Sequence, residues 1–384
     1  MNTAHDSLSL EELRFYADRH SIPVEDVVFI ALNFFGLNWD VEFNRMRTAL
    51  RLSEDSRFSE ARALDEWNYY LALPVRPDSP FRLENGDLLL GSDLVGRTFG
   101  ATEDYCDSHY QRRMGTCLNI NPNTRTSCRG CDFCYTAYQV PLDRQKMTTP
   151  DEIRGFFTNW VSEQRVPDLS HLQQISIVTG CYGSEAHLVN FLLSLRDEAS
   201  KLGFDGRIFY LGSALSDPVA IKRLGESGPF GYCISLECFD RRTILHRTKA
   251  ALSLEAIKET MSTSMDAGME VNYTYIVGLE PIEEFIPRME EFTACTNKFP
   301  TVNLLQLHQQ HDAGLRDPSA GTLDYYLSAR RAIENIYRDT ELRPKAWEDY
   351  RSLWFLRFGG EAVEGPRFPD RESISELQGL SVGA

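Results

Sequence analysis

The chain has 384 residues, a length that suits one large domain with additions or two ordinary domains. Its formal net charge of -16 argues against a nucleic-acid partner, because binding to phosphate groups requires clustered Lys and Arg. The longest nearly apolar run, residues 27–37, is about half of the roughly 20 residues that cross a bilayer, so no membrane segment is expected. The N-terminus is polar and acidic, unlike a signal peptide, and we expect a cytoplasmic protein.

Residues 1–70 are predicted to be helical. Ser9 is followed three positions later by Glu12, which matches a capping box at a helix start, and a second apolar helical segment begins near Pro23. Residues 81–100 are typical of a hairpin that turns at Asn85-Gly86. We therefore expect residues 1–105 to form a helical cap plus this hairpin.

From about residue 114 short apolar strands alternate with amphipathic helices. Strands are predicted at 115–120, 172–180, 207–212, 231–237, 270–278 and 302–308. Helices are predicted between them at 149–164, 185–203, 217–228, 253–268 and 281–297. Repeated strand–helix units imply a parallel sheet, and six are too few for the usual eight-stranded closed barrel.

The predicted fold is α/β, a partial (β/α)6 barrel of parallel strands over residues 106–310, with an N-terminal helical cap and a C-terminal helical extension. The extension, residues 311–384, is rich in Tyr, Trp and Arg. We expect it to pack across the barrel and close its open side.

Three of the nine cysteines lie within seven residues of one another, in the stretch SCRGCDFCY: Cys128, Cys131 and Cys134. Thiolates at this spacing can bind one metal centre from a single loop. A zinc site needs four ligands, and Cys106, His109 or Cys117 could supply the fourth. An iron–sulfur cluster can instead use three cysteines and leave one iron open. The loop follows the first predicted strand of the repeat, where barrel folds carry their active sites, and this favours the iron–sulfur cluster.

Three close cysteines after the first strand of a βα repeat, with the aromatic Phe133 before the last of them, resemble the radical S-adenosylmethionine (SAM) superfamily. The resemblance covers roughly residues 114–310. It implies that the three cysteines bind a [4Fe–4S] cluster beside Phe133, and that SAM chelates the fourth iron. The usual spacing in the superfamily is Cys-x3-Cys-x2-Cys, whereas here it is Cys-x2-Cys-x2-Cys, so Cys117 is kept as an alternative to Cys128.

The resemblance also implies SAM contacts at the ends of the second and fourth strands. After the second strand, three residues loosely match the family's Gly-Gly-Glu element: Gly180, Gly183 and Glu185. A plain strand–helix turn with Ser184 as N-cap is the alternative. At the end of the fourth strand, Glu237 and Ser235 share one face and are the expected cofactor contacts. A buried Glu needs a partner, and the candidates to pair with it or to hold the SAM carboxylate are Arg247, Lys249 and Lys258.

The fifth and sixth strands supply the remaining candidates. The fifth resembles the family's adenine-binding strand, with candidates Asn272, Tyr273, Ile276 and Gly278. The sixth ends in residues that could face a substrate: Gln306, His308 and His311. For His308 a hydrogen-bonded structural role is the alternative.

The implied activity is that of a radical SAM enzyme, similar to the biotin-synthase-like group. It would cleave SAM reductively and use the resulting 5′-deoxyadenosyl radical to abstract hydrogen from a small-molecule substrate, for example one of specialised metabolism. The electron would come from an external donor of the flavodoxin or ferredoxin type. The alternative from another class is a non-catalytic iron–sulfur or zinc protein, with the loop as structure or as an electron relay.

Overall fold

The structure is a computed structural model. It describes residues 8–53, 58, 69–105, 109–112, 116–122, 128, 130–139, 147–179, 182–308, 314–345 and 351–363. None of the helices in these ranges has the length and hydrophobicity needed to span a bilayer.

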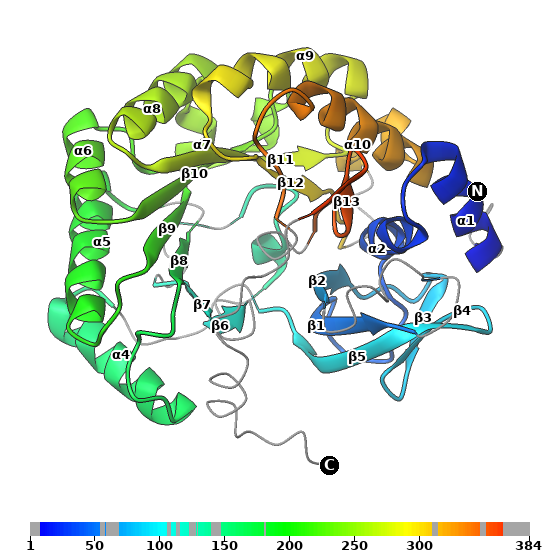
Figure 1. Cartoon of the computed structure of the whole chain (residues 1–384), viewed down its shortest axis with the longest axis horizontal. Helices are drawn as coiled ribbons and strands as arrows, with labels where there is room; N and C mark the ends of the chain where they lie inside the picture. The colour runs from blue at the N-terminus through cyan, green and yellow to red at the C-terminus, as the bar shows by residue number, and fades with distance from the viewer. Residues whose placement is uncertain are drawn as a thin grey trace.

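A curled, half-open barrel forms the centre of the molecule (Figure 1). Six parallel strands make its sheet in chain order: β7 (Cys117–Ile120), β8 (Gln174–Val178), β9 (Arg207–Gly212), β10 (Phe230–Glu237), β11 (Glu270–Val277) and β12 (Thr301–Leu304). A seventh strand, β6 (Tyr110–Arg112), pairs antiparallel with β7 at one edge. The predicted α/β partial barrel is confirmed, and all six parallel strands lie where the sequence pattern puts them.

Helices cover the outer face of this sheet (Figure 1). They are α4 (Pro150–Gln164), α5 (Glu185–Ser200), α6 (Pro218–Glu226), α8 (Leu254–Asp266) and α9 (Ile282–Phe292), with the short η4 (Thr293–Cys295) after α9. Alternation along the strands explains the layers. Tyr273 on β11, for example, packs against Phe292 of α9, so its neighbours Asn272 and Thr274 face the inside of the barrel.

The N-terminal region differs from the prediction. Helices α1 (Leu10–His20) and α2 (Val24–Phe35) form as expected, and Ser9 caps α1 by accepting the N–H of Glu12 at 3.2 Å. A five-stranded antiparallel sheet follows, in the order β2-β1-β5-β4-β3. Its strands are β1 (Arg45–Leu52), β2 (Tyr69–Pro74), β3 (Phe81–Glu84), β4 (Asp87–Leu90) and β5 (Asp93–Glu103). The expectation of helices throughout residues 1–70 was therefore wrong.

The predicted hairpin is confirmed. Glu84 pairs with Asp87 across the turn, and Asn85 and Gly86 both take positive φ angles, 52° and 87°. Such a turn matches the right-handed twist of its two strands, and Asn-Gly suits it because both residues tolerate left-handed backbone.

The C-terminal region is only partly helical. It contains η6 (Pro318–Ala320), α10 (Leu323–Tyr337) and a small hairpin, β13 (Arg357–Phe358) with β14 (Glu361–Ala362). Arg330 of α10 forms a fully buried ion pair with Asp26 of α2, 2.8 Å long. The N-terminal elements thus lie with the C-terminal ones on the open side of the half barrel (Figure 1), where the extension alone had been expected.

Candidate active site

The carboxyl end of β10 departs from regular strand geometry. The pairing of β10 with β11 shifts register between Ile234 and Glu237. Glu237 itself has a positive φ of 69°, a left-handed conformation that costs a non-glycine residue about 1–2 kcal/mol. Such outliers concentrate at functional sites, where the surrounding structure enforces them.

Glu237 has the basic partner that its burial requires. Lys249 of the short helix α7 (Arg247–Ala251) donates to its carboxylate, and both residues are buried. Of the three candidate partners, the structure selects this one. Lys258 instead lies on α8, 2.7 Å from Glu291, with its amino group over the ring of Phe292.

The cysteine loop is bound to the segment that follows β10. The Asp132 N–H donates to the Ile244 carbonyl at 3.2 Å, within η3 (Arg242–Ile244). The His246 N–H donates to the Cys131 sulfur at 3.3 Å, and the His246 ring contacts the Gly130 carbonyl at 2.8 Å. These contacts fix the loop at the carboxyl end of the barrel.

An apolar cluster packs beneath the loop. Cys131 is 4% exposed and belongs to one buried group with Ile276 of β11, Leu305 after β12 and Cys238 after β10, and Phe133 packs against this group. Of the residues that the resemblance implied to be near the cofactor, Ile276 therefore belongs to the same cluster as Cys131, and Phe133 packs against that cluster. Gly278 has a φ of 111°, and a Cβ there would lie 2.6 Å from the Tyr326 hydroxyl, so only glycine fits.

The electrostatics of this end are unusual for a protein interior. Burial raises the pKa of the Cys131 thiol to about 11, although Lys249 and the His246 N–H act in the opposite direction. Burial lowers the pKa of Lys249, but the charges of Glu237 and Cys131 outweigh it and raise that pKa overall. Cys131, Glu237 and Lys249 thus form one electrostatically coupled group.

The three thiols of the loop are chemically suitable metal ligands, but their positions do not form a preformed metal site. Among the described residues, no three His, Cys, Asp or Glu side chains converge as metal ligands do. Cys131 and Cys134 are close enough to influence each other's charge.

The alternative ligands lie elsewhere or outside the described residues. Cys117 is at the amino end of β7, where its thiol contacts Ser176 at 3.4 Å and Asn119 at 3.5 Å. His109 accepts from the Asn121 N–H at 3.3 Å and packs edge-on against Phe156 of α4. Cys106 lies outside the described residues.

The turn after β8 favours the plain strand–helix interpretation. Ser184 caps α5 by accepting the His187 N–H at 3.3 Å. The Glu185 carboxylate accepts the N–H groups of Ser216 and Asp217 at 2.6 and 2.7 Å, so it holds the start of α6. Gly183 has no close neighbour that would clash with a Cβ, and Gly180 lies outside the described residues.

The candidates from β12 meet the N-terminal region. Gln306 donates to Asn33 of α2 and to the Ala72 carbonyl of β2, at 2.8 and 2.7 Å. This explains Gln306 as part of an internal interface. His308 packs against Tyr135 of η2 (Tyr135–Tyr138) with 4.7 Å between ring centroids. His311 lies outside the described residues.

The N-terminal sheet reaches the cysteine loop through arginines that sequence reasoning missed. Arg45 of β1 lies over the Tyr135 ring, 5.5 Å from its centroid, and Tyr135 directly follows Cys134. Arg45 and Arg47 both pair with the buried Asp104. The sequence analysis expected a helix here, and in a helix these arginines give no sign that they pair with Asp104. Only a β-strand assignment for residues 45–52 would have placed Arg45 and Arg47 on the same face.

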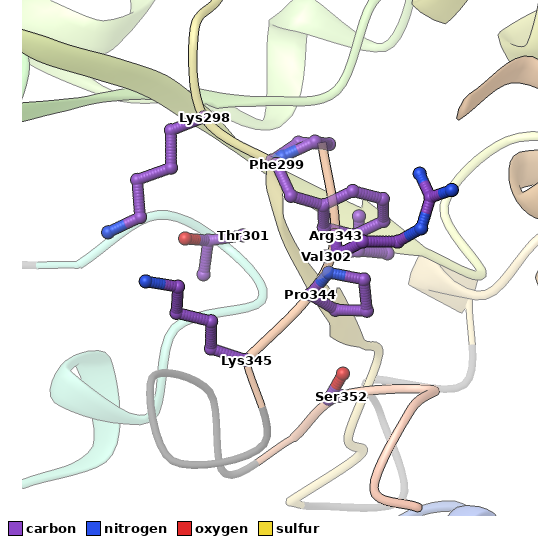
Figure 2. Close-up of a pocket in the computed structure, with 9 residues that line it drawn as sticks. Lys298, Phe299, Thr301, Val302, Arg343, Pro344, Lys345 and Ser352 are labelled. Atoms are coloured by element: carbon purple, nitrogen blue, oxygen red, sulfur yellow. The ribbon is translucent and has the colours of Figure 1, made fainter. Parts of the chain in front are cut away.

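A shallow pocket lies at the other end of the barrel (Figure 2). Its lining includes Lys298, Thr301 and Lys345, whose polar tips point to the same side in Figure 2. Thr301 begins β12, so the pocket is at the amino end of the strand. It is not part of the candidate active site.

Comparisons with known proteins give only a distant fold likeness. The chain matches no protein-family model, and no curated protein matches it. Crystal structures of Streptococcus suis SuiB resemble it at TM-scores of 0.41 (bound to S-adenosylmethionine), 0.39 (bound to precursor peptide SuiA) and 0.40. Sequence identity is 12%, 13% and 13%, over 59%, 58% and 59% of this chain.

The matched region spans 49%, 45% and 48% of those SuiB chains, about half their length. At this identity and TM-score the likeness carries no argument about the activity of the present chain. The case for function therefore depends on its own residues.

Proposed function

We propose that the protein is a radical SAM enzyme acting on a small molecule. The observation that carries the proposal is the docking of the three-cysteine loop at the carboxyl end of the half barrel. There Cys131 accepts the His246 N–H and shares one apolar cluster with Cys238, Ile276 and Leu305, which lie at the ends of β10, β11 and β12. A non-catalytic zinc or relay protein needs no such convergence with a left-handed, buried glutamate.

When bound, a [4Fe–4S] cluster would supply one-electron reductive cleavage of the C5′–S bond of SAM, with the electron coming from an external donor of the flavodoxin or ferredoxin type. Cys128, Cys131 and Cys134 would hold the cluster, and Glu237 would receive the SAM amino or ribose groups. Ile276 and Gly278 would border the adenine. Phe133 and the apolar group around Cys131 would exclude water.

Arg247 is the remaining candidate for the SAM carboxylate. It has a positive φ of 53° and begins α7, two residues before Lys249. A guanidinium at this position could pair with a carboxylate near the loop. Lys258 and Glu185 are not carried into this proposal, because both are engaged elsewhere.

The test is anaerobic purification and reconstitution with iron and sulfide. We expect absorbance near 400 nm, a cubane EPR signal after reduction, and 5′-deoxyadenosine from SAM with dithionite. Cys131→Ala should abolish all three. Cys295→Ala, in η4, should abolish none. A colourless protein with one tetrahedral zinc, or a Cys131→Ala variant that still binds iron and cleaves SAM, would contradict the proposal.

A further inference from the structure

Three strands contribute to one inner surface of the half barrel. The Thr301 hydroxyl on β12 contacts the Cys233 sulfur of β10 at 3.8 Å and the Asn272 amide of β11 at 3.2 Å. These three residues therefore face the interior. Alternation places Thr274, two residues after Asn272, on the same face. Ser235 lies two residues after Cys233, where the register of β10 against β11 shifts.

This surface holds polar atoms without partners among the described residues. Ser235 is 0% exposed and Thr274 is 3% exposed, and neither hydroxyl has a hydrogen-bond partner in the part of the chain that the structure describes. The Oδ1 atom of Asn272 is a third such atom. Folded proteins satisfy most buried polar groups with protein, water or ligand partners, so each of these three atoms offers a hydrogen bond to a bound water or ligand.

Charged residues lie above and below this surface, and they are paired. Toward the cysteine loop, Lys249 pairs with Glu237. Toward the amino ends of the strands, Glu270 pairs with Arg207 and lies 3.7 Å from Lys298. A charged ligand group between these levels would lose its hydration while the nearest charges already engage each other.

A hydroxyl group suits the surface better, because it can donate and accept at once. It can satisfy the hydroxyls of Ser235 and Thr274 in either direction, and it can donate to Oδ1 of Asn272. We propose that the part of the substrate lying here is uncharged and rich in hydroxyl groups, such as a sugar ring, and that Thr274, Ser235 and Asn272 bind it. That the ligand is the substrate rests on the proposed function.

The first test uses stability and needs no cluster. Thr274→Val replaces an unsatisfied buried hydroxyl by a methyl group of the same shape, so the melting temperature should rise by about 1–3 °C. Thr296→Val is the matched control, because its buried hydroxyl is bonded to the Val271 carbonyl at 2.7 Å; its melting temperature should fall. A fall for Thr274→Val as well would overturn the inference.

The second test measures binding by calorimetry on the reconstituted protein. The probes are methyl glucoside and uridine, against glucuronate and uridine monophosphate as their charged counterparts. We expect an uncharged probe to bind at least tenfold more tightly than its counterpart, and Thr274→Val to weaken that binding at least tenfold. Absence of binding, equal binding of the charged probes, or insensitivity to Thr274→Val would overturn the inference.

The ribose of SAM offers the same hydroxyl chemistry, so the binding test is repeated with saturating S-adenosylhomocysteine. Retained probe binding supports a separate substrate site. Loss of probe binding assigns the surface to the SAM ribose and overturns the inference. If the proposed function is wrong, no 5′-deoxyadenosine forms from SAM. The stability test does not depend on that reaction, so the two failures can be told apart.

Discussion

The two ends of the half barrel carry the same kinds of charged residue in different environments. At the carboxyl end Glu237 and Lys249 are 6% and 9% exposed. At the amino end the Glu270 side chain is 52% exposed while it pairs with Arg207. A buried ion pair seldom repays its desolvation, whereas a partly exposed pair costs little. Folding alone accounts for the amino end, but the carboxyl end, with its left-handed glutamate, calls for a functional explanation.

The largest expected effect separates these two ion pairs directly. Lys249→Met should destabilise the protein by about 3–5 kcal/mol, because it leaves Glu237 buried without a counter-charge. Lys298→Met at the amino end should cost under about 1 kcal/mol, because Glu270 keeps Arg207 and solvent. Denaturant unfolding of the apo-protein measures both.

A control for the first variant is the double change Glu237→Leu with Lys249→Met, which removes both charges and should recover most of the loss. If Lys249→Met and Lys298→Met lowered the free energy of unfolding by the same amount, the two ends of the barrel would not differ in this respect.

The next effect concerns the pH dependence of the unfolding free energy, through His308 near the cysteine loop. Burial, and then the charges of Arg45 and Arg351, lower the pKa of His308 well below its usual value of about 6.5. The unfolded chain therefore binds a proton that the folded protein rejects, and stability falls as pH drops below about 6.5, by at most about 1.4 kcal/mol per pH unit.

His308→Gln should remove this contribution, so that its unfolding free energy falls less than that of the wild type between pH 7 and pH 5. His187→Gln, on the exposed side of α5, is the control and should follow the wild type. Parallel pH profiles for His308→Gln and wild type would refute the assignment.

The smallest effect tests backbone conformation at the carboxyl end. Arg247→Gly relieves a left-handed residue and should stabilise the protein by up to about 1 kcal/mol, while weakening SAM binding if Arg247 pairs with the carboxylate. Arg165→Gly is matched, since Arg165 is the left-handed C-cap of α4 with a φ of 56°. It should give the same stabilisation and leave SAM binding unchanged; calorimetric SAM titration distinguishes the two variants.

Much of the fold could be predicted from local sequence pattern. The strand at 207–212 and the helix start at Thr149, with its full capping box, both follow from neighbouring residues alone. The first strand of the N-terminal sheet could not, because Arg45 and Arg47 are buried against Asp104. That arrangement hides the alternation of apolar and polar residues by which a strand is recognised.

The candidate site divides in the same way. The spacing of the cysteines and the burial of a glutamate at the end of β10 were visible in the sequence, and so was the need for a basic partner. The sequence did not show that Glu237 pairs with Lys249 and not with Lys258, because both lysines follow Glu237 within about 20 residues. Only the path of α7 brings Lys249 back to Glu237.

By itself the sequence determined the alternation of six strands with helices, the Asn85-Gly86 turn and the position of the cysteine loop after β7. These features depend on residues close in the chain, whose periodicity and turn preferences act locally. Only the tertiary structure decided which side chains meet at the carboxyl end. It also decided that Ser235 and Thr274 are buried without hydrogen-bond partners among the described residues. Desolvation and pairing depend on groups far apart in the chain, so no local pattern encodes them.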